Sequence, residues 1–389
     1  GFRLMSGSNN FDAPKELEDI NIYSSIPDNP YLLLTPGPLS TSKGVRAAML
    51  FDLCTWDSQY KELTQKIRSK LVNMATENPA KYTAVLMQGS GTFCVEAVLG
   101  SVISESCRLL ILSNGAYGKR MEQISRGLRL NYSVNDTPED KPLDASLLEK
   151  NLSENPNITH VAFVHCETTT GILNPLDKIT EIIKKYDKKI ILDAMSSFGG
   201  IKFDIDSNGI DFLISSANKC IEGVPGFAFV IARKEEIEKS ANVSKSLSLD
   251  IYDQWKEMDR DGKWRFTSPT HTVRAFYQAL LELEAEGGIE ARNKRYRDNQ
   301  KYLVKGMEEI GFKCLIPKEL QSPIITSFLY PESSIFNFDK FYNELKINGF
   351  GIYPGKISTH ETFRIGNIGN VTKDDITRLL EVIKVIKFW

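Results

Sequence analysis

One short turn combines small residues and hydroxyl groups in a way that could bind an anion. The segment QGSGT at 88–92 follows an apolar run and precedes a helical pattern. Such a turn presents backbone N–H groups at the positive end of a helix dipole, and the hydroxyls of Ser90 and Thr92 add donors. No GK[ST] follows, which excludes a Walker loop, and Cys94 stands where a dinucleotide fingerprint needs its third glycine. The turn therefore indicates either a phosphate cradle at Ser90, Gly91 and Thr92 or an ordinary tight strand-to-helix connection.

Two charged residues stand at the ends of strand-like runs. Asp193 ends KIILD, and Lys219 follows DFLISSAN. If both runs are parallel strands, both side chains lie at the carboxyl edge of the sheet, where open α/β sheets bind ligands. A lone Asp there is usually a turn residue, and a lone Lys is usually a solvated charge. Lys219, however, is followed by the apolar CIEGVPGFAF, and a desolvated lysine has a lowered pKa and can form Schiff bases.

The same lysine completes a second pattern, the Ser-x-x-Lys spacing of acylating hydrolases such as β-lactamases, with Ser216 as its serine. That chemistry also requires Ser-Asp-Asn and Lys-Thr-Gly partners. The sequence contains neither partner motif, so we set the hydrolase interpretation aside.

The cradle, the carboxylate and the lysine together predict a site for pyridoxal 5′-phosphate (PLP). This cofactor needs an anion site for its phosphate and a lysine that binds it covalently. It also needs a carboxylate that keeps its pyridine nitrogen protonated, so that the ring can accept electrons. Each feature is weak alone, and their order and their placement at strand ends make the combination much more specific.

The elements that must position these residues alternate along the chain. A helix is predicted near 60–74, where apolar residues recur at helical spacing, and further helices at 92–104, 117–128 and 177–186. Strands are predicted at 83–88, 108–114, 160–167, 189–195, 211–217 and 227–234. Near-continuous apolar strands separated by helices indicate an α/β fold with a mainly parallel sheet that is buried on both faces.

The same pattern divides the chain into three parts. Residues 1–30 are polar and rich in turn formers, and we interpret them as a linker-like or tag-like segment. A large α/β domain is predicted at 31–285, with 31–44 expected to contact both domains, and a smaller α+β domain at 286–389. Ser268 and Pro269 fit a helix start, with Ser as the cap and Pro in the first turn.

Composition excludes several classes of function. The 389 residues carry 48 Lys and Arg against 50 Asp and Glu, a balance that argues against a nucleic-acid binder or a polybasic membrane binder. The longest apolar runs are too short to span a bilayer, and no secretion signal is evident. Six scattered cysteines without CxxC indicate reduced thiols and a cytoplasmic protein, and no histidine pair has zinc spacing, so no metal is expected.

Several longer motifs carry a resemblance to a known family. They are LLLTPGPL, MLFDLCTWD, LMQGSGT, SNGAYGKRM, VHCETTTGILNPL, LDAMSSFGG, ISSANKCIEGVPGFAFVIAR, GKWRFTSPTHTV and FRIGNIG. Through them the chain resembles the class V aminotransferases of PLP fold type I, from about residue 31 to 389. The resemblance implies a seven-stranded, mainly parallel sheet between helices, a smaller C-terminal α+β domain and a homodimer with shared active sites.

The resemblance also implies how the cofactor is held. Lys219 would bind PLP covalently and shuttle the reacting proton, and Asp193 would pair with the pyridine nitrogen. The phosphate would be held by the cradle, by Asn218, and by Thr270 from a second subunit. The remaining contacts would be a hydrogen bond from Thr168 to the ring hydroxyl, an aromatic stack from Tyr117 and packing on the other ring face by Met195.

The substrate would be bound through its anionic end. The resemblance assigns this role to Arg364 of FRIG, and Lys356 of YPGK is a second candidate cation. The implied reaction is reversible amino transfer between 2-aminoethylphosphonate and pyruvate, giving phosphonoacetaldehyde and L-alanine. The alternatives are an alanine– or serine–glyoxylate aminotransferase of the same class, and a protein of this fold that binds PLP but acts as a partner or regulator.

Overall fold

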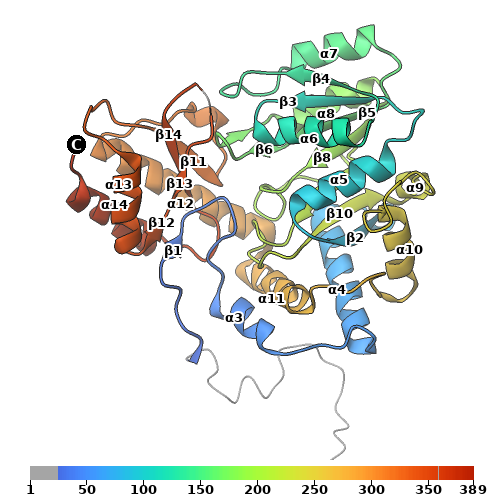
Figure 1. Cartoon of the computed structure of the whole chain (residues 1–389), viewed down its shortest axis with the longest axis horizontal. Helices are drawn as coiled ribbons and strands as arrows, with labels where there is room; N and C mark the ends of the chain where they lie inside the picture. Colours follow the sequence, from blue (N-terminus) through green and yellow to red (C-terminus); the bar gives the residue numbers. More distant parts are fainter. Residues whose placement is uncertain (1–24, 358) are drawn as a thin grey trace, which may run out of the picture.

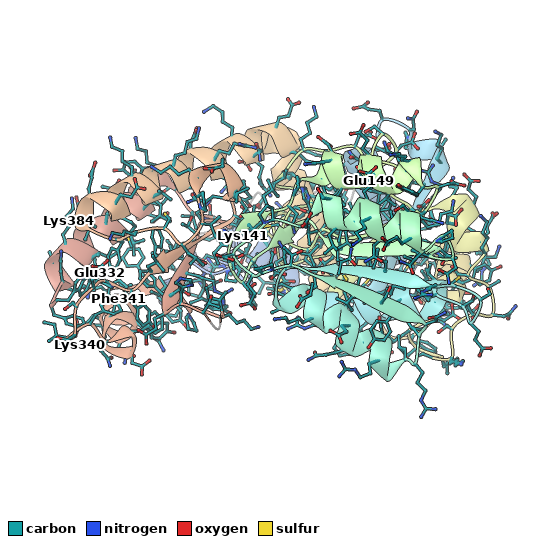
Figure 2. The ribbon with its side chains drawn as sticks, turned by 90° about the horizontal axis from the view of Figure 1, so that it is seen from above. Lys141, Glu149, Glu332, Lys340, Phe341 and Lys384 are labelled. Carbon is teal, nitrogen blue, oxygen red and sulfur yellow. The ribbon has the colours of Figure 1, made fainter. Side chains whose placement is uncertain are left out.

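The computed structural model describes residues 25–357 and 359–389, so most of the predicted 1–30 segment lies outside the described residues. Figure 1 shows two lobes, a larger one built around a sheet and a smaller one formed by the C-terminal part of the chain. In Figure 2, Phe341 lies inside the smaller lobe, whereas Lys340 and Lys384 lie at its outer rim. The division into domains near residue 285 remains a prediction.

The larger lobe contains a seven-stranded sheet in the order β2-β10-β9-β8-β5-β3-β4. Every pairing is parallel except those of β10, which runs antiparallel to both β2 and β9. The prediction of a mainly parallel sheet is confirmed. The strands are β2 Tyr82–Gln88, β3 Leu109–Ser113, β4 Tyr132–Asp136, β5 His160–Val164, β8 Lys189–Asp193, β9 Phe212–Ser216 and β10 Phe227–Arg233.

Strands β3, β5 and β9 are buried at every position, and β8 between β9 and β5 is buried from its second residue on, so both faces of the sheet are covered. The hydrophobic effect of this burial is the main stabilising contribution to the lobe. The helices that follow or cover the strands are α3 Lys43–Ala47, α4 Ser58–Ala75, α5 Gly91–Val102, α6 Ala116–Gly127, α7 Ala145–Glu154, α8 Leu176–Lys185, α9 Lys234–Glu238, α10 Ile251–Asp261 and α11 Thr270–Glu286. Three short 3₁₀ turns lie at Ala48–Leu50, Pro79–Lys81 and Lys318–Leu320.

The smaller lobe is built on a three-stranded antiparallel sheet in the order β11-β14-β13. Its core is aromatic, with Phe312, Phe328 and Phe363 in edge or stacked contacts. Strand β1 of the N-terminal segment pairs in parallel with β12 of this lobe. The elements are β1 Leu32–Leu33, α12 Gly288–Ile310, β11 Ile325–Leu329, α13 Phe338–Ile347, β12 Phe350–Gly351, β13 Tyr353–Pro354, β14 Thr362–Gly366 and α14 Lys373–Ile386.

Two local predictions were wrong. The predicted strand at 160–167 is interrupted at His165: β5 ends at Val164, and the two-residue strand β6 Cys166–Glu167 pairs instead with β7 Ile172–Leu173. Helix α11 begins at Thr270, and the Ser268 side chain does not cap it. The Ser268 hydroxyl instead lies 2.6 Å from the Tyr60 hydroxyl, so it ties α11 to α4.

Within the described ranges, no helix is long and apolar enough to cross a membrane. Nor do the described residues contain a group of three or more His, Cys, Asp or Glu side chains that could hold a metal ion.

Candidate active site

The carboxyl edge of the sheet forms a cavity that gathers most of the predicted site residues. Asp193 ends β8, Lys219 follows β9, and the first turn of α5 follows β2, so three chain segments meet at one edge. The predicted residues that line this cavity are Ser90, Gly91, Thr92, Tyr117, Asp193, Met195, Asn218 and Lys219. Thr168, Thr270 and Arg364 are not part of its lining.

The predicted anion cradle is the N-terminus of α5. Ser90 is the N-cap residue, and its side chain makes no capping hydrogen bond to the helix. A Cβ at Gly91 would lie 2.6 Å from the Sδ of Met195, so a side chain there would displace the flexible end of that methionine. The first N–H groups of a helix carry partial positive charge, so this small, hydroxyl-lined end suits a phosphate.

Arg120 adds a positive charge to the same cavity, and the sequence reasoning missed it. Its Nη1 donates to the Oγ1 of Thr92 at 3.2 Å, and its guanidinium lies 5.0 Å from the centre of the Tyr117 ring. The residue stands one helical turn after Tyr117 on α6. The spacing within AYGKR at 116–120 could therefore have revealed it, because residues three apart share a helix face.

Burial moves the pKa values of both central ionisable groups. Asp193 is 5% exposed, and desolvation raises its pKa from 3.8 to about 6, against the opposing charges of Lys219 and Arg120. Its Oδ1 accepts a hydrogen bond from the backbone N of Met195 at 3.0 Å. Desolvation lowers the pKa of Lys219 from 10.5 to about 8. The cavity therefore favours the neutral form of each group.

The TPGP turn of the N-terminal segment covers Lys219. The lysine Nζ donates to the carbonyl oxygen of Pro36 at 2.8 Å. Gly37 has φ +111°, a conformation that favours glycine, and a Cβ there would lie 2.8 Å from the Cδ of Lys219. The sequence reasoning did not assign Pro36 this contact, since nothing local in TPGP shows which distant side chain it meets.

Arg364 is a buried cation on β14. It is 4% exposed, and burial lowers its pKa. Its Nη1 donates to the carbonyl oxygen of Thr168 at 2.8 Å, and its Nε donates to that of Pro354 at 3.0 Å. Among the described residues its hydrogen-bond partners are carbonyl oxygens, and the Glu167 carboxylate acts on it only at longer range, in the direction that raises its pKa. A buried guanidinium without a directly bonded carboxylate is suited to receiving an anion from outside the chain.

Thr168 and Glu167 form a buried polar pair beside the cavity. The Oγ1 of Thr168 has no hydrogen-bond partner in the structure, although the residue is 1% exposed. The neighbouring Glu167 was missed by the sequence reasoning: burial raises its pKa to about 7, and its Oε2 also lacks a partner. Buried polar atoms are nearly always satisfied, so both atoms are free to form a hydrogen bond with a bound group.

Thr270 and Lys356 lie apart from this cavity. Thr270 starts α11, and its Oγ1 lies 3.5 Å from the Nδ1 of the neighbouring His271. Lys356 is exposed. Within one subunit, therefore, the structure brings neither residue to Lys219.

Comparison with known proteins places the chain among amino-group transferases. Residues 52–379 match the family "Aminotransferase class-V". A 2-aminoethylphosphonate–pyruvate transaminase of Bacillus cereus is 58% identical over 357 residues, covering 92% of this chain and 98% of that protein. The protein of the same name from Phocaeicola vulgatus is also 58% identical, covering 92% and 99%.

Solved structures show the same fold. Alanine–glyoxylate aminotransferase from Nostoc sp. superposes with a TM-score of 0.84 at 23% identity, covering 94% of this chain and 99% of that one. Pyridoxamine–pyruvate aminotransferase from Mesorhizobium loti gives 0.83 at 24% identity, covering 92% and 93%.

Proposed function

This chain belongs to the class-V aminotransferase family, and we propose that it transfers an amino group between 2-aminoethylphosphonate and pyruvate, giving phosphonoacetaldehyde and L-alanine. The observation that carries the chemistry is the meeting of Lys219, Asp193 and the start of α5 in one cavity. The names of relatives that are 58% identical over most of their length support the choice of substrates.

The cofactor in this proposal is PLP, and the residues present fit it. The uncapped start of α5 would receive the phosphate, Asp193 the pyridine nitrogen, and the unpartnered Oγ1 of Thr168 the ring hydroxyl. When bound, PLP supplies an electron sink that stabilises negative charge at the carbon next to the amine. The other proposed contacts are the stacking face of Tyr117, the packing of Met195 and the amide of Asn218, all of which line the cavity.

Lys219 would move the reacting proton. A pKa of about 8 leaves a substantial fraction of its Nζ neutral near pH 7.5, so the amine can accept a proton from the substrate carbon and return one. The Nζ is partly shielded from water and donates to the carbonyl oxygen of Pro36. Asp193, with a pKa near 6, is mostly ionised at that pH and can accept a hydrogen bond from a protonated ring nitrogen.

Arg364 would bind the anionic end of each substrate in turn. The amine donor bears a phosphonate two carbons from its nitrogen, whereas alanine bears a carboxylate one carbon from its nitrogen. A planar guanidinium can meet either group with two parallel N–H donors, which an ammonium does not do. Its burial without a carboxylate partner in the described chain supports this role.

A panel of amine donors tests the proposal. Alanine formation from pyruvate is measured with 2-aminoethylphosphonate, serine and 2-aminoethylsulfonate, and alanine itself is offered with glyoxylate. We expect clear preference for the phosphonate donor. Preference for alanine with glyoxylate would favour the alanine–glyoxylate alternative. Tight PLP binding without turnover of any donor would favour a non-catalytic role.

Two further features belong to this proposal. The first is a homodimer in which Thr270 of the partner subunit completes the phosphate site. Large apolar side chains are exposed around the start of α5 and before α11, at Phe93 and Phe266, which supports a covered surface there. The second is a cytoplasmic location, supported by free cysteines throughout the described chain.

A further inference from the structure

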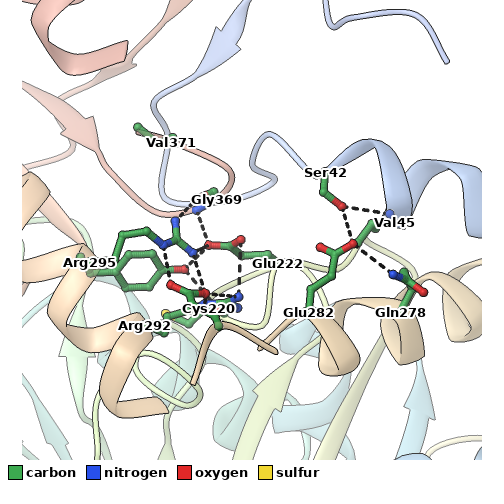
Figure 3. A network of polar contacts seen from close by, with 12 residues as sticks. Ser42, Val45, Cys220, Glu222, Gln278, Glu282, Arg292, Arg295, Gly369 and Val371 are labelled. Atoms are coloured by element: carbon green, nitrogen blue, oxygen red, sulfur yellow. Dashed lines mark hydrogen bonds and ion pairs between the residues drawn. The ribbon is translucent and has the colours of Figure 1, made fainter. Parts of the chain in front are cut away.

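The chain segment that carries Lys219 is held by a buried cluster of charged side chains. We define the lysine loop as residues 218–223 and the Glu222 cluster as Glu222, Glu286, Arg292, Arg295 and Tyr296. Glu222 is in the lysine loop, Glu286 ends α11, and the other three residues are on α12. Figure 3 shows Glu222 between Arg292, Arg295 and Gly369.

One oxygen atom of Glu222 accepts nearly all of these contacts. Its Oε1 lies 2.6 Å from the Tyr296 hydroxyl and accepts from Arg295 Nη2 at 2.8 Å. It also accepts from the backbone N of Gly369 at 3.2 Å. The other oxygen, Oε2, has only a long ion pair, 3.8 Å from Arg292 Nη2. The carboxylate is therefore used mainly as a single acceptor that joins three chain segments.

The same cluster fixes the backbone beside the lysine. Arg292 Nη1 donates to the carbonyl oxygen of Cys220 at 2.8 Å, and the Tyr296 hydroxyl lies 3.2 Å from that oxygen. The backbone N of Glu222 donates to the carbonyl oxygen of Lys219 at 2.8 Å. Both ends of the three-residue turn after Lys219 are thus held from α12.

The cluster also reaches the segment that follows Arg364. Gly369 comes three residues after the end of β14, and its backbone contacts the cluster in both directions. Its N donates to Glu222, and its carbonyl oxygen accepts from Arg295 Nη1 at 2.7 Å. The lysine loop and the strand of the buried arginine are therefore joined through two side chains.

The backbone conformation of Glu222 is unfavourable for a residue with a side chain, which indicates that this side chain has a role. Its φ is +68°, in the left-handed region that glycine adopts most easily. Backbone preference alone would place glycine at this position. Glutamate bears the conformational cost and supplies the acceptor.

We propose that Glu222 is a positioning residue, which holds the Nζ of Lys219 in register with the guanidinium of Arg364. This rests on the proposed function only for the roles of those two groups. Because the working atom is one acceptor oxygen, Glu222→Gln, with its carbonyl oxygen in the Oε1 position, should keep the three hydrogen bonds. Glu222→Ala should release the lysine loop.

Hydrogen exchange of the cofactor-free protein tests the positioning without any turnover. In Glu222→Ala we expect the amides of 218–223 to exchange about tenfold faster, because local opening becomes easier. In Glu222→Gln they should exchange as in the wild type. Glu236→Ala is a matched control, since Glu236 is equally buried (7% exposed against 8%) and bonds Lys189 of β8 and Lys239 just after α9, away from the lysine loop.

Steady-state kinetics of the PLP-loaded enzyme give the second measurement. Glu222→Ala should lower kcat by about 10²-fold, a loss typical of a reacting group displaced by about 1 Å. Glu222→Gln and Glu236→Ala should stay within about threefold of the wild type, well short of such a loss. If Glu222→Ala does not fold, Tyr296→Phe removes one donor and should give a smaller rise in exchange of the same amides.

Unchanged exchange of the lysine loop in Glu222→Ala, or equal effects in Glu236→Ala, would overturn the proposal. The proposal would also be overturned if Glu222→Gln were as damaging as Glu222→Ala. The negative charge of Glu222, rather than its acceptor oxygen, would then hold the lysine loop. A wild-type enzyme that turns over none of the donors would refute the proposed function instead, while the exchange experiment would still decide the positioning role.

Discussion

Burial in the cavity favours the neutral forms of Asp193 and Lys219, and this lowers the stability of the cofactor-free protein near neutral pH. The pKa of Asp193 is about 6 when folded against an ordinary 3.8. Between these values the folded chain binds a proton that the unfolded chain has lost. The contribution of this group to stability is therefore full below about pH 4, falls as the pH rises to about 6, and stays low above it.

Asp193→Asn should consequently stabilise the cofactor-free protein while impairing the enzyme. The amide has no charge to desolvate, so at pH 7.5 we expect a gain of roughly 2–3 kcal/mol in the free energy of unfolding. The gain should shrink as the pH falls toward 4. Single-turnover proton transfer should slow greatly, because a neutral amide does not favour a protonated pyridine nitrogen. Thermal melting at several pH values and stopped-flow absorbance give the two readouts, and a variant with wild-type single-turnover rates would remove Asp193 from this role.

Lys219 should be the residue that borohydride labels. The holoenzyme should be yellow because of an absorbance band of the bound cofactor. Borohydride reduction should bleach that band, and peptide mapping should find the cofactor attached to Lys219. In the cofactor-free protein, acylation of this amine should be half-maximal near pH 8 rather than 10.5, because burial lowers its pKa. Lys219→Ala should lose turnover. Label on another lysine would contradict the assignment.

Arg364→Lys should lower the specificity constant kcat/KM for both substrates. A lysine keeps the charge but loses the planar fork, so kcat/KM for 2-aminoethylphosphonate and for pyruvate should fall by an equivalent of roughly 2–4 kcal/mol. Melting temperature and PLP affinity should barely change. A variant that is less stable yet keeps both specificity constants would make Arg364 a structural brace. Impairment for one substrate alone would mean that another cation, for which Lys356 is a candidate, holds the other anion.

At the scale of elements, the first turn of α5 depends on the absence of a side chain at Gly91. Gly91→Ala should push the flexible end of Met195 away from its packing position, because the new Cβ would overlap its Sδ and Cε. We expect PLP affinity to fall about tenfold, consistent with the loss of roughly one good contact, with little change in melting temperature. Gly127→Ala on α6 is the control, since nothing lies within 4 Å of its Cβ position. Equal PLP affinity for both variants would count against the cradle.

The elements that sequence could predict are those whose signal is local. Apolar runs in the sequence predicted β3, β5, β8 and β9. The order of the motifs predicted that Asp193 and Lys219 lie at one edge of the sheet. The antiparallel direction of β10 was not predictable, because a buried strand reads the same in either direction. Arg120 was missed although its spacing from Tyr117 on α6 could have revealed it. The contact of Pro36 with Lys219 and the buried setting of Glu167 depend on packing against distant parts of the chain, which no local spacing encodes.

For the whole molecule, the testable feature is the shared site. Thr270→Ala should weaken PLP binding, and Lys219→Ala should abolish turnover. If Thr270 of the partner subunit completes each site, a hybrid dimer of these two variants contains one intact site. At a PLP concentration that does not saturate Thr270→Ala, the mixture should be more active than the mean of the separate variants. If the mixture shows only the mean activity of the two separate variants, the shared site is contradicted. A fully active protein that light scattering shows to be a monomer would also contradict it.

The pairing of β1 with β12 sets the order in which the site can be completed during synthesis. Leu32 is translated more than three hundred residues before its partner Phe350. The hydrogen bond from the backbone N of Gly366 to the carbonyl oxygen of Leu34 also forms only after Gly366 has been translated. Until then the nearby turn, whose Pro36 carbonyl receives the lysine amine, has its local hydrogen bonds, such as that from the Thr35 hydroxyl to the Pro38 carbonyl oxygen, but not the strand pairing that anchors it. Lys219 therefore gains its final environment only after residues up to Gly366 have been translated, and a nascent chain that stops before them would hold the lysine without its cover.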